Sequence, residues 1–322
     1  MTQHPTTITS KLDSVGGSVV MPRSFWSAII ATTKPGITRL VTITALVGFA
    51  MSALGRGWTS SGLILALCGS AIGTFLSAAG ANALNQWLER DRDARMPRTA
   101  MRPIPAGHIT ASAVRTAGLS LCAAGLLTLW FTVGLIPMLV SLACMLSYIL
   151  AYTPLKTRTV LATLVGTIPG SLPPLIGWTS AGAVSGNVLA PGGVSLFILM
   201  TIWQLPHFWA IAWLYREDYA HGGYRVLPMI DPSGRKTATA IVLTSIALLP
   251  ATLWPAWAMP DLLGALYMSV AGVTGLAFLG LAFSMAKDRS RKSARRLFFA
   301  SIIHLPLLLI AMVLDAFVHT FL

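Results

Sequence analysis

Three oxygen-bearing side chains follow one another at helical spacing in the first third of the chain. Asn85, Glu89 and Asp93 are each four residues apart, so on an α-helix they would lie along one face, with Asp91 on another. Carboxylate and amide oxygens suit Mg²⁺, which proteins bind through a few carboxylates together with substrate phosphates. The spacing therefore predicts a metal–phosphate site.

Arginines are interleaved with these three residues. The stretch from residue 85 to residue 107 contains five of the 23 Lys and Arg residues of the chain. A guanidinium group forms paired, charge-assisted hydrogen bonds to phosphate oxygens, and we expect Arg92, Arg98 and Arg102 to bind substrate. A solvated loop whose arginines only fix membrane topology would explain the basic residues. It would not explain the helical spacing of Asn85, Glu89 and Asp93, which we call the ladder.

A second segment, residues 203 to 224, combines a histidine and a carboxylate with many aromatic residues. His207 and Asp218 would lie on one helical face, about three turns apart. Several of the aromatic side chains are expected at the membrane interface, but aromatic faces can also stabilise a carbocation, and Trp209 is predicted to contact substrate. From spacing alone, His207 is equally consistent with a buried core histidine.

The elements that carry these residues must be membrane helices. The chain has 322 residues, of which 55% are hydrophobic and 10% charged, and its mean hydropathy is +0.72, too apolar for a soluble domain. About nine apolar runs reach the roughly 20 residues that cross a bilayer. Cys68, Cys122 and Cys144 fall inside these runs without C-x-x-C spacing, and we expect buried free thiols with neither disulfide nor zinc.

The predicted fold is therefore an all-α membrane protein with nine transmembrane helices. Residues 1–24 are expected to be a polar cytoplasmic tail, and residues 25–322 a single polytopic domain. The predicted spans are residues 35–54, 62–84, 112–131, 135–152, 160–178, 194–215, 237–257, 261–286 and 297–321. Span five, residues 160–178, is rich in Gly and Pro, which we interpret as close helix packing.

The basic residues predict the orientation of these spans. With a cytoplasmic N-terminus, every Lys and Arg except Arg56 falls on the cytoplasmic side, as the positive-inside rule requires. Nine spans then put the C-terminus outside. The net charge of +13 is thus mostly a topology signal and a match to anionic membrane lipid, and nucleic acid is not an expected partner.

Three motifs resemble the haem-modifying branch of the intramembrane polyprenyltransferase superfamily, the protohaem IX farnesyltransferases. They read N-x-x-x-E-R-D-x-D-A-x-M-x-R-T-x-x-R-P from Asn85, Y-T-x-L-K-x-R-T from Tyr152 and W-Q-L-P-H-F-W-A-I-A from Trp203. The first motif alone indicates the superfamily, whereas its R-D-x-D continuation together with P-H-F-W is specific to the haem-modifying branch. The resemblance runs from about Thr33 to the last span.

This resemblance implies a central cavity open to the cytoplasm and a reaction that joins farnesyl diphosphate to a vinyl group of haem b. It implies Mg²⁺ or Mn²⁺, with ligands at Asn85, Glu89, Asp93 and Asp218. It also implies catalytic basic residues at Lys156 and Arg158, and substrate contacts at Tyr152 and His207. Glu89 stands where many relatives have Asp, and His207 stands where other branches begin their second motif with Asp. Both departures call a complete second metal site into question.

Two other functions fit parts of the sequence. A secondary transporter would use carboxylates near the bilayer midplane, but here Asp315 is the only carboxylate in the interior of a predicted span, and Asp261 stands at the first residue of its span. Another prenyltransferase of the superfamily would act on an aromatic acid or a quinone precursor. The resemblance itself implies a bacterial-type inner (plasma) membrane, and a haem A-forming enzyme or oxidase assembly as partners.

Overall fold

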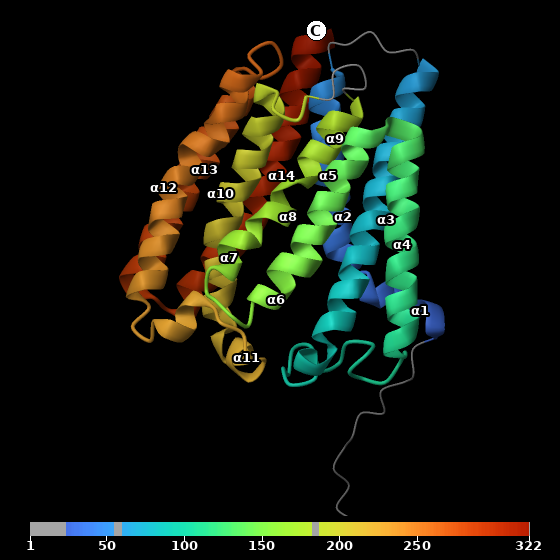
Figure 1. The fold of residues 1–322 in the computed structure, drawn as a ribbon. Coiled ribbons are helices and arrows are strands. Elements are labelled where there is room, and N and C mark those ends of the chain that lie inside the picture. Colours follow the sequence, from blue (N-terminus) through green and yellow to red (C-terminus); the bar gives the residue numbers. More distant parts are fainter. Residues whose placement is uncertain (1–23, 55–59, 182–186, 322) are drawn as a thin grey trace, which may run out of the picture.

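The computed structural model describes residues 24–54, 60–181 and 187–321. In these ranges the regular structure is helical (Figure 1), and eight helices are long and apolar enough to cross a membrane. The long helices are α2 (Pro35–Ala53), α3 (Ser60–Asp93), α4 (Ala111–Val133), α5 (Leu135–Leu146), α10 (Pro191–Leu214), α12 (Arg235–Ala258), α13 (Ala265–Asp288) and α14 (Arg291–Phe321). The crossing that starts with α5 extends to Leu155 through a π-helix, Ser147–Tyr152, and α6 (Thr153–Leu155).

The segment predicted as span five is not one continuous helix. It is divided into α7 (Ala162–Val165), α8 (Thr167–Ser171) and α9 (Pro173–Ala181). Proline lacks the N–H that a helix interior needs, and its ring clashes with the preceding turn, so Pro169 and Pro173 interrupt the run. The fold class is as predicted, but the ninth crossing stays a prediction because it lies outside the eight long helices.

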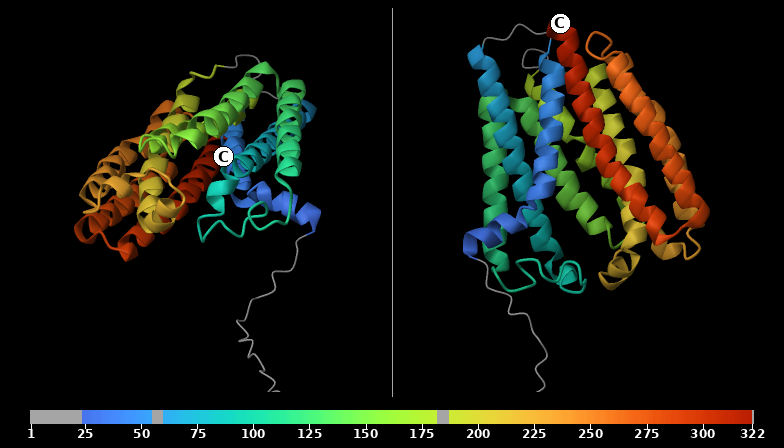
Figure 2. Two further views of the ribbon diagram at one scale, coloured as in Figure 1. Left: turned by 60° about the horizontal axis from the view of Figure 1, so that its bottom comes forward. Right: turned by 180° about the vertical axis from the view of Figure 1, so that it is seen from behind.

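The helices pack as two groups (Figures 1 and 2). In the first group α2, α3, α4, α5 and α9 each contact the next, and α9 returns to α2. In the second group α10, α12, α13 and α14 close a four-helix bundle in the same way. Contacts of α2 with α14 and of α8 with α10 join the groups, and the largest hydrophobic core lies mainly in the second group.

Glycine allows α9 to pack backbone to backbone against α2. A Cβ added to Gly177 would lie 1.6 Å from the carbonyl oxygen of Ala45, and one added to Gly48 would lie 2.0 Å from that of Pro174. The glycines near span five therefore serve close helix packing, as predicted from the sequence. This contact fixes the broken crossing against the first group.

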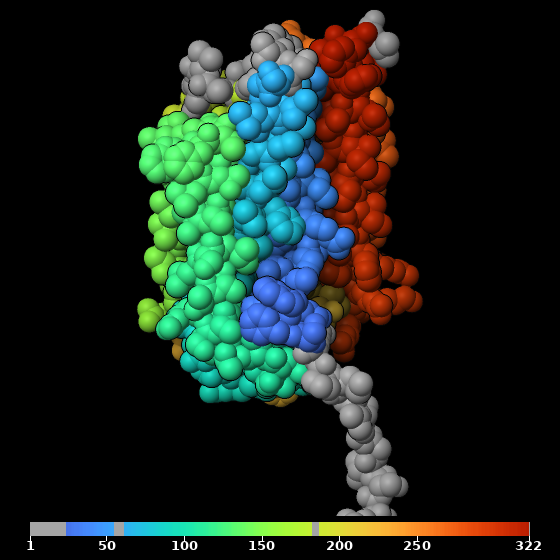
Figure 3. Space-filling model, turned by 90° about the vertical axis from the view of Figure 1, so that its right-hand side faces the viewer, coloured from blue at the N-terminus to red at the C-terminus, as the bar shows by residue number. Residues whose placement is uncertain are grey.

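The two ends of the bundle differ. The loop of residues 94–110, helix α1 (Phe25–Thr32) and helix α11 (Arg216–His221) lie at one end, which we call the charged end, and the C-terminus lies at the other (Figure 1). Figure 3 shows α1 at the charged end, where it packs against α3 and α4. At the opposite end the buried Asp315 of α14 accepts the N–H groups of Gly264, at 2.6 Å, and Tyr267, at 3.0 Å, and so caps α13.

The three cysteines lie on long helices, and no disulfide is found within the described ranges. Cys122 is buried and Cys144 is half-buried, but Cys68 is exposed. The prediction that all three are buried is therefore wrong for Cys68. The hydropathy of a span does not indicate which helix face a residue occupies, and an apolar thiol is compatible with an outer, lipid-facing position.

Candidate functional site

A cavity of about 450 Å³ lies between the two helix groups. Seven of its lining residues are ionic: Lys34, Glu89, Asp93, Arg98, Arg102, Lys156 and Arg225. Most of the remaining wall is apolar or aromatic, with side chains such as Val41, Met145, Ile176, Trp203 and Phe208. Such a cavity suits a ligand with an anionic group and a long apolar portion.

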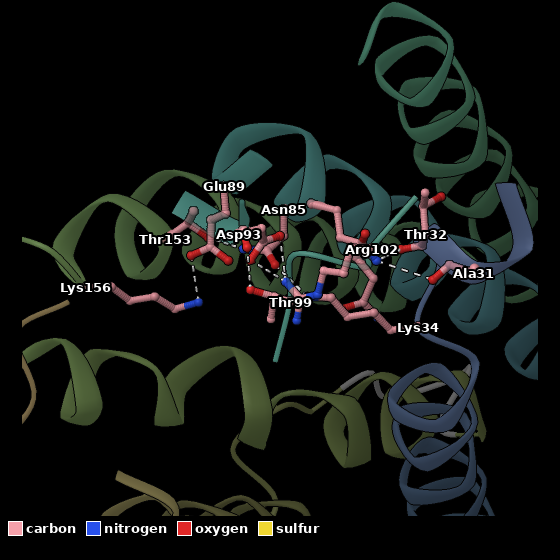
Figure 4. Close-up of polar contacts among 12 residues, drawn as sticks. Ala31, Thr32, Lys34, Asn85, Glu89, Asp93, Thr99, Arg102, Thr153 and Lys156 are labelled. Carbon is pink, nitrogen blue, oxygen red and sulfur yellow. Dashed lines mark hydrogen bonds and ion pairs between the residues drawn. The ribbon is translucent and has the colours of Figure 1, made fainter. Parts of the chain in front are cut away.

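The predicted ladder lies on α3 near the charged end. Asn85, Glu89 and Asp93 are all buried, with exposed fractions of 0%, 3% and 1%, and Figure 4 shows their side chains on the same side of the helix. Asp91 points away and forms an exposed ion pair with Arg90 at 3.7 Å. The structure therefore brings together the three residues that the spacing selected.

Each member of the ladder is held by its own cation (Figure 4). The Lys34 Nζ donates to Asn85 Oδ1 at 2.6 Å, and the Lys156 Nζ donates to Glu89 Oε1 at 2.9 Å. The Arg102 Nη1 lies 2.7 Å from both carboxylate oxygens of Asp93. All three oxygens thus have positive partners before any ligand is bound.

The amide of Asn85 has a defined orientation. Its Nδ2 donates to Thr153 Oγ1 at 3.0 Å, and that hydroxyl donates in turn to the carbonyl oxygen of Tyr148 at 2.8 Å. Because the amide nitrogen is held on the Thr153 side, Oδ1 is directed to Lys34.

Lys34 is a site residue that the sequence motifs did not single out. It lies between α1 and α2 with a φ of 49°, an uncommon conformation for a residue with a side chain. Pro35 follows it at the start of α2. This conformation accompanies the contact of its ammonium group with Asn85, and strained backbone of this kind often occurs at functional sites.

Lys34 and Lys156 differ in pKa. Burial, reinforced by the nearby Arg102, lowers the pKa of Lys34 to about 7. Burial would also lower the pKa of Lys156, but the carboxylate of Glu89 outweighs it and the pKa lies well above its ordinary value. Lys156 is therefore a permanent cation, whereas Lys34 is easily deprotonated.

The π-helix positions a group of tyrosines beside Lys156. Tyr148 and Tyr152 stack with their ring centroids 5.9 Å apart, and the Lys156 Nζ lies 4.5 Å from the Tyr152 centroid and 5.8 Å from that of Tyr224. A π-turn inserts an extra residue into a helix and is frequent at functional sites. Tyr148, Tyr219 and Tyr224 also line the cavity. None of them was predicted as a site residue, although Tyr219 and Tyr224 belong to the aromatic-rich segment of residues 203 to 224.

The predicted helical face shared by His207 and Asp218 does not exist. Helix α10 ends at Leu214, and Tyr215, with φ −113° and ψ 27°, starts the separate helix α11. Asp218 lies on α11, with its Oδ2 4.0 Å from the Nε of Arg98. Because of this break, Asp218 does not continue the helical face of α10 that carries His207. Its ion-pair partner Arg98 does line the cavity.

His207 lines the apolar part of the cavity. Its ring lies between those of Trp203 and Phe298, with centroids 5.1 and 5.2 Å away, and its Nδ1 is 2.6 Å from Ser301 Oγ on α14. His304, the other histidine within a predicted span near this depth, is 3% exposed and packs against Phe278.

Five predicted site residues are not among the described residues that line the cavity, namely Asn85, Asp218, Arg92, Arg158 and Trp209. Arg92 is half-buried at the end of α3, and Arg158 is exposed. Trp209 is 9% exposed and belongs to the core of the second group. Trp203 belongs to the same core but also lines the cavity, as does Phe208.

The donor set fits a single hard cation in the presence of phosphate. Among the described residues no three His, Cys, Asp or Glu side chains gather closely enough to hold a metal ion. Two carboxylates and one amide oxygen do lie on one face of α3, at Glu89, Asp93 and Asn85, and Mg²⁺ commonly takes one or two carboxylates plus phosphate oxygens and water. Asp218 lies apart from this set, paired with Arg98.

The chain is similar to known proteins over most of its length. The chain is 40% identical over 293 residues to a protoheme IX farnesyltransferase of Solibacter usitatus, covering 89% of this chain and 97% of the relative. It is 39% identical to a protoheme IX farnesyltransferase of Myxococcus xanthus, covering 90% and 94%. The fold matches a digeranylgeranylglyceryl phosphate synthase structure with a TM-score of 0.71 at 16% identity, over 90% and 98% of the two chains.

A second solved structure with the same fold is a UbiA homologue from Archaeoglobus fulgidus bound to GPP and Mg²⁺. Its TM-score is 0.61 at 14% identity, and the match covers 89% of this chain and 99% of that one. The sequence model of the UbiA prenyltransferase family matches residues 24–303. The chain therefore belongs to the UbiA prenyltransferase family.

Proposed function

We propose that this protein transfers the farnesyl group of farnesyl diphosphate to a vinyl group of protohaem IX, giving haem O and diphosphate. The observation that carries the proposal is the set of three cation–oxygen pairs at the charged end of an otherwise apolar cavity. Relatives at about 40% identity that bear the name protoheme IX farnesyltransferase support the choice of acceptor.

The first step is binding of the diphosphate by Lys34, Lys156 and Arg102. Each cation now contacts a side-chain oxygen of the ladder, and phosphate oxygens offer it a stronger, charge-assisted hydrogen bond. As the cations turn toward the phosphates, Glu89 and Asp93 become free to act as metal ligands. Mg²⁺ or Mn²⁺ held there with Asn85 would neutralise charge that develops on the departing diphosphate.

The reaction itself needs charge stabilisation and a dry pocket. The bond between farnesyl C1 and the diphosphate oxygen breaks, and its electron pair leaves with the diphosphate. Lys156 and Arg102 stabilise that negative charge because both are held near the cavity, Lys156 half-buried beside Glu89 and Arg102 against Asp93. The farnesyl chain lies along the apolar wall, where Trp203 and Phe208 present aromatic rings and limit access of water to the allylic cation.

The acceptor then completes the bonding. The vinyl group of protohaem IX attacks farnesyl C1 and forms a carbon–carbon bond, which leaves the inner vinyl carbon electron-deficient. Water adds its oxygen to that carbon and gives up a proton to the released diphosphate or to solvent. The product carries a hydroxyethylfarnesyl group, and no side chain has to form a covalent bond to substrate. His207 lines the cavity beside Trp203 and Phe208, and we assign it to contact with the porphyrin.

The proposed orientation puts the charged end of the bundle in the cytoplasm of a bacterial-type cell. All Lys and Arg residues of the chain except Arg56 lie on that side of the predicted topology. Farnesyl diphosphate would then enter the cavity from the cytoplasm, where its charged group first meets Arg98 and Arg225, both of which line the cavity.

The test is product analysis in cells that make no haem O. Expression of the wild-type chain should produce haem O, identified by mass in a haem extract, and Asp93→Asn at an equal membrane level should produce none. A metal chelator should abolish activity in isolated membranes. Absence of haem O with wild-type protein present, together with a prenylated aromatic acid or quinone precursor, would instead assign another acceptor.

The basic residues provide a matched pair for the diphosphate step. Lys156→Ala should lower the rate by roughly 10²–10³-fold, the usual effect of removing one charge-stabilising donor. Arg158 lies two residues away and is exposed, so Arg158→Ala should change the rate only a few-fold. Equal losses in both variants, with protein amounts unchanged, would contradict the assignment of Lys156 to the diphosphate.

A further inference from the structure

The environment of His207 defines which ring nitrogen faces the cavity. Its Nδ1 is 2.6 Å from Ser301 Oγ, whereas its Nε2 forms no hydrogen bond to any described residue and is not among the buried unpaired atoms. The ring is held flat between Trp203 and Phe298. Nε2 is therefore the nitrogen that a ligand in the cavity can reach.

The hydrogen bonds of Ser301 favour one tautomer of the imidazole. The Ser301 hydroxyl has one hydrogen, and it donates this hydrogen to the carbonyl oxygen of Phe298 at 2.6 Å. Toward His207 it can then only accept, so Nδ1 carries the proton. In a neutral imidazole Nε2 consequently has a free lone pair. A charged imidazolium would have to be desolvated between two aromatic rings, which is costly without a counter-charge.

The position of Ser301 is itself fixed by a second contact. Its carbonyl oxygen accepts the indole N–H of Trp203 at 3.0 Å, so Trp203 both stacks on His207 and holds the α14 residue that orients it. Three side chains from α10 and α14 thus fix the ring plane, the tautomer and the direction of the free nitrogen. A histidine that only filled space in the core would need none of these.

We infer that His207 binds the iron of the haem substrate through Nε2, and that Ser301 is the positioning residue that keeps this nitrogen unprotonated. The inference rests on the proposed function for the identity of the ligand. Neutral imidazole is a common iron ligand, and a hydrogen bond from the other ring nitrogen fixes its orientation and increases its basicity. Ligation would hold the porphyrin, and hence its vinyl group, at a fixed depth relative to the diphosphate.

The test is spectroscopic titration of haem b into the purified full-length protein in detergent. Wild-type protein should give the absorption spectrum of histidine-ligated haem. His207→Gly should lose that spectrum and regain it when free imidazole is added. Ser301→Ala should keep the ligated spectrum but bind haem about 10-fold more weakly, as expected for loss of a ligand-orienting hydrogen bond, and Ser301→Thr should restore the affinity.

Two controls separate ligation from pocket shape. Iron-free protoporphyrin IX should bind wild type and His207→Gly equally, because it has no iron to ligate. His304→Ala should not change the haem spectrum, since His304 is a buried histidine on α14 that does not line the cavity. A wild-type haem spectrum in His207→Gly, or equal haem affinity of Ser301→Ala and wild type, would overturn the inference. Failure of the wild-type protein to bind haem at all would overturn the proposed function itself.

Discussion

Removal of one member of the buried Glu89–Lys156 pair should destabilise the protein more than removal of both. The two charges are 2.9 Å apart, and their side chains are 4% and 20% exposed. At an effective dielectric constant of about 20, two charges at this distance attract by about 6 kcal/mol before desolvation is subtracted. Breaking a buried pair by removing one partner typically costs about 3–5 kcal/mol.

We therefore expect Glu89→Gln and Lys156→Met each to lower the free energy of unfolding by about 3 kcal/mol, the low end because Lys156 keeps some exposure. The double variant has no charge left without a partner and should lose about 1 kcal/mol or less. All three should release diphosphate from farnesyl diphosphate roughly 10²–10³-fold more slowly. Stability and catalysis thus separate in the double variant.

The assay is a double-mutant cycle on unfolding in mixed micelles, followed by tryptophan fluorescence. The matched control is the exposed Arg90–Asp91 pair, whose side chains are 37% and 74% exposed and whose coupling should be at most about 1 kcal/mol. If the coupling between Glu89 and Lys156 is no larger than that of this control, the pair is not a buried ion pair and the reasoning fails. Full activity of the double variant would refute its role in diphosphate release.

Three further predictions concern packing, protonation and capping. Gly177→Ala should lower the free energy of unfolding by about 1–3 kcal/mol or more, because the added Cβ would overlap the carbonyl oxygen of Ala45. The control is Gly280→Ala, whose added Cβ would have no neighbouring atom within 4 Å, and it should leave the unfolding midpoint unchanged or slightly raised. The pKa of Lys34 is lowered by burial from 10.5 to about 7, so between these pH values the unfolded chain binds more protons and the stability of the substrate-free protein should rise with pH. A pH series of unfolding midpoints should show this rise in wild type and its loss in Lys34→Met; an equal rise in both would contradict the assignment. Asp315→Leu removes the acceptor for two N–H groups at the start of α13 and should cost about 1–3 kcal/mol for each of them, measured as a lower unfolding midpoint, with a smaller loss in Asp315→Asn.

The ladder on α3 could be predicted because it depends only on helical periodicity. Residues four apart share a face in any helix. The long apolar run before Asn85 predicts a membrane helix that extends to this residue. The same periodicity failed for Asp218. The α10 pattern continues through Tyr215 in the sequence, but the backbone turns there, and no local residue such as proline marks the turn.

Partners from distant parts of the chain could not be predicted at all. Lys34 meets Asn85 across 51 residues, and Ser301 meets His207 across 94. A lysine beside a membrane span resembles a topology signal, and a serine in an apolar helix carries no pattern of its own. Trp203 and Trp209 were indistinguishable by type. Both belong to the hydrophobic core, and only the packing of α10 decides that Trp203 also lines the cavity.

The pairing of Glu89 and Asp93 with their cations has a consequence for the kinetic order of the enzyme. A bare divalent ion that arrives first must compete with Lys156 and Arg102 for the carboxylates, whereas diphosphate offers both cations new acceptors and releases the carboxylates at the same moment. Ion and diphosphate should thus bind with strong mutual synergy, each raising the affinity of the other by the same factor. After diphosphate departs, we expect Lys156 and Arg102 to re-form their ion pairs with Glu89 and Asp93, which restores the arrangement seen in the structure.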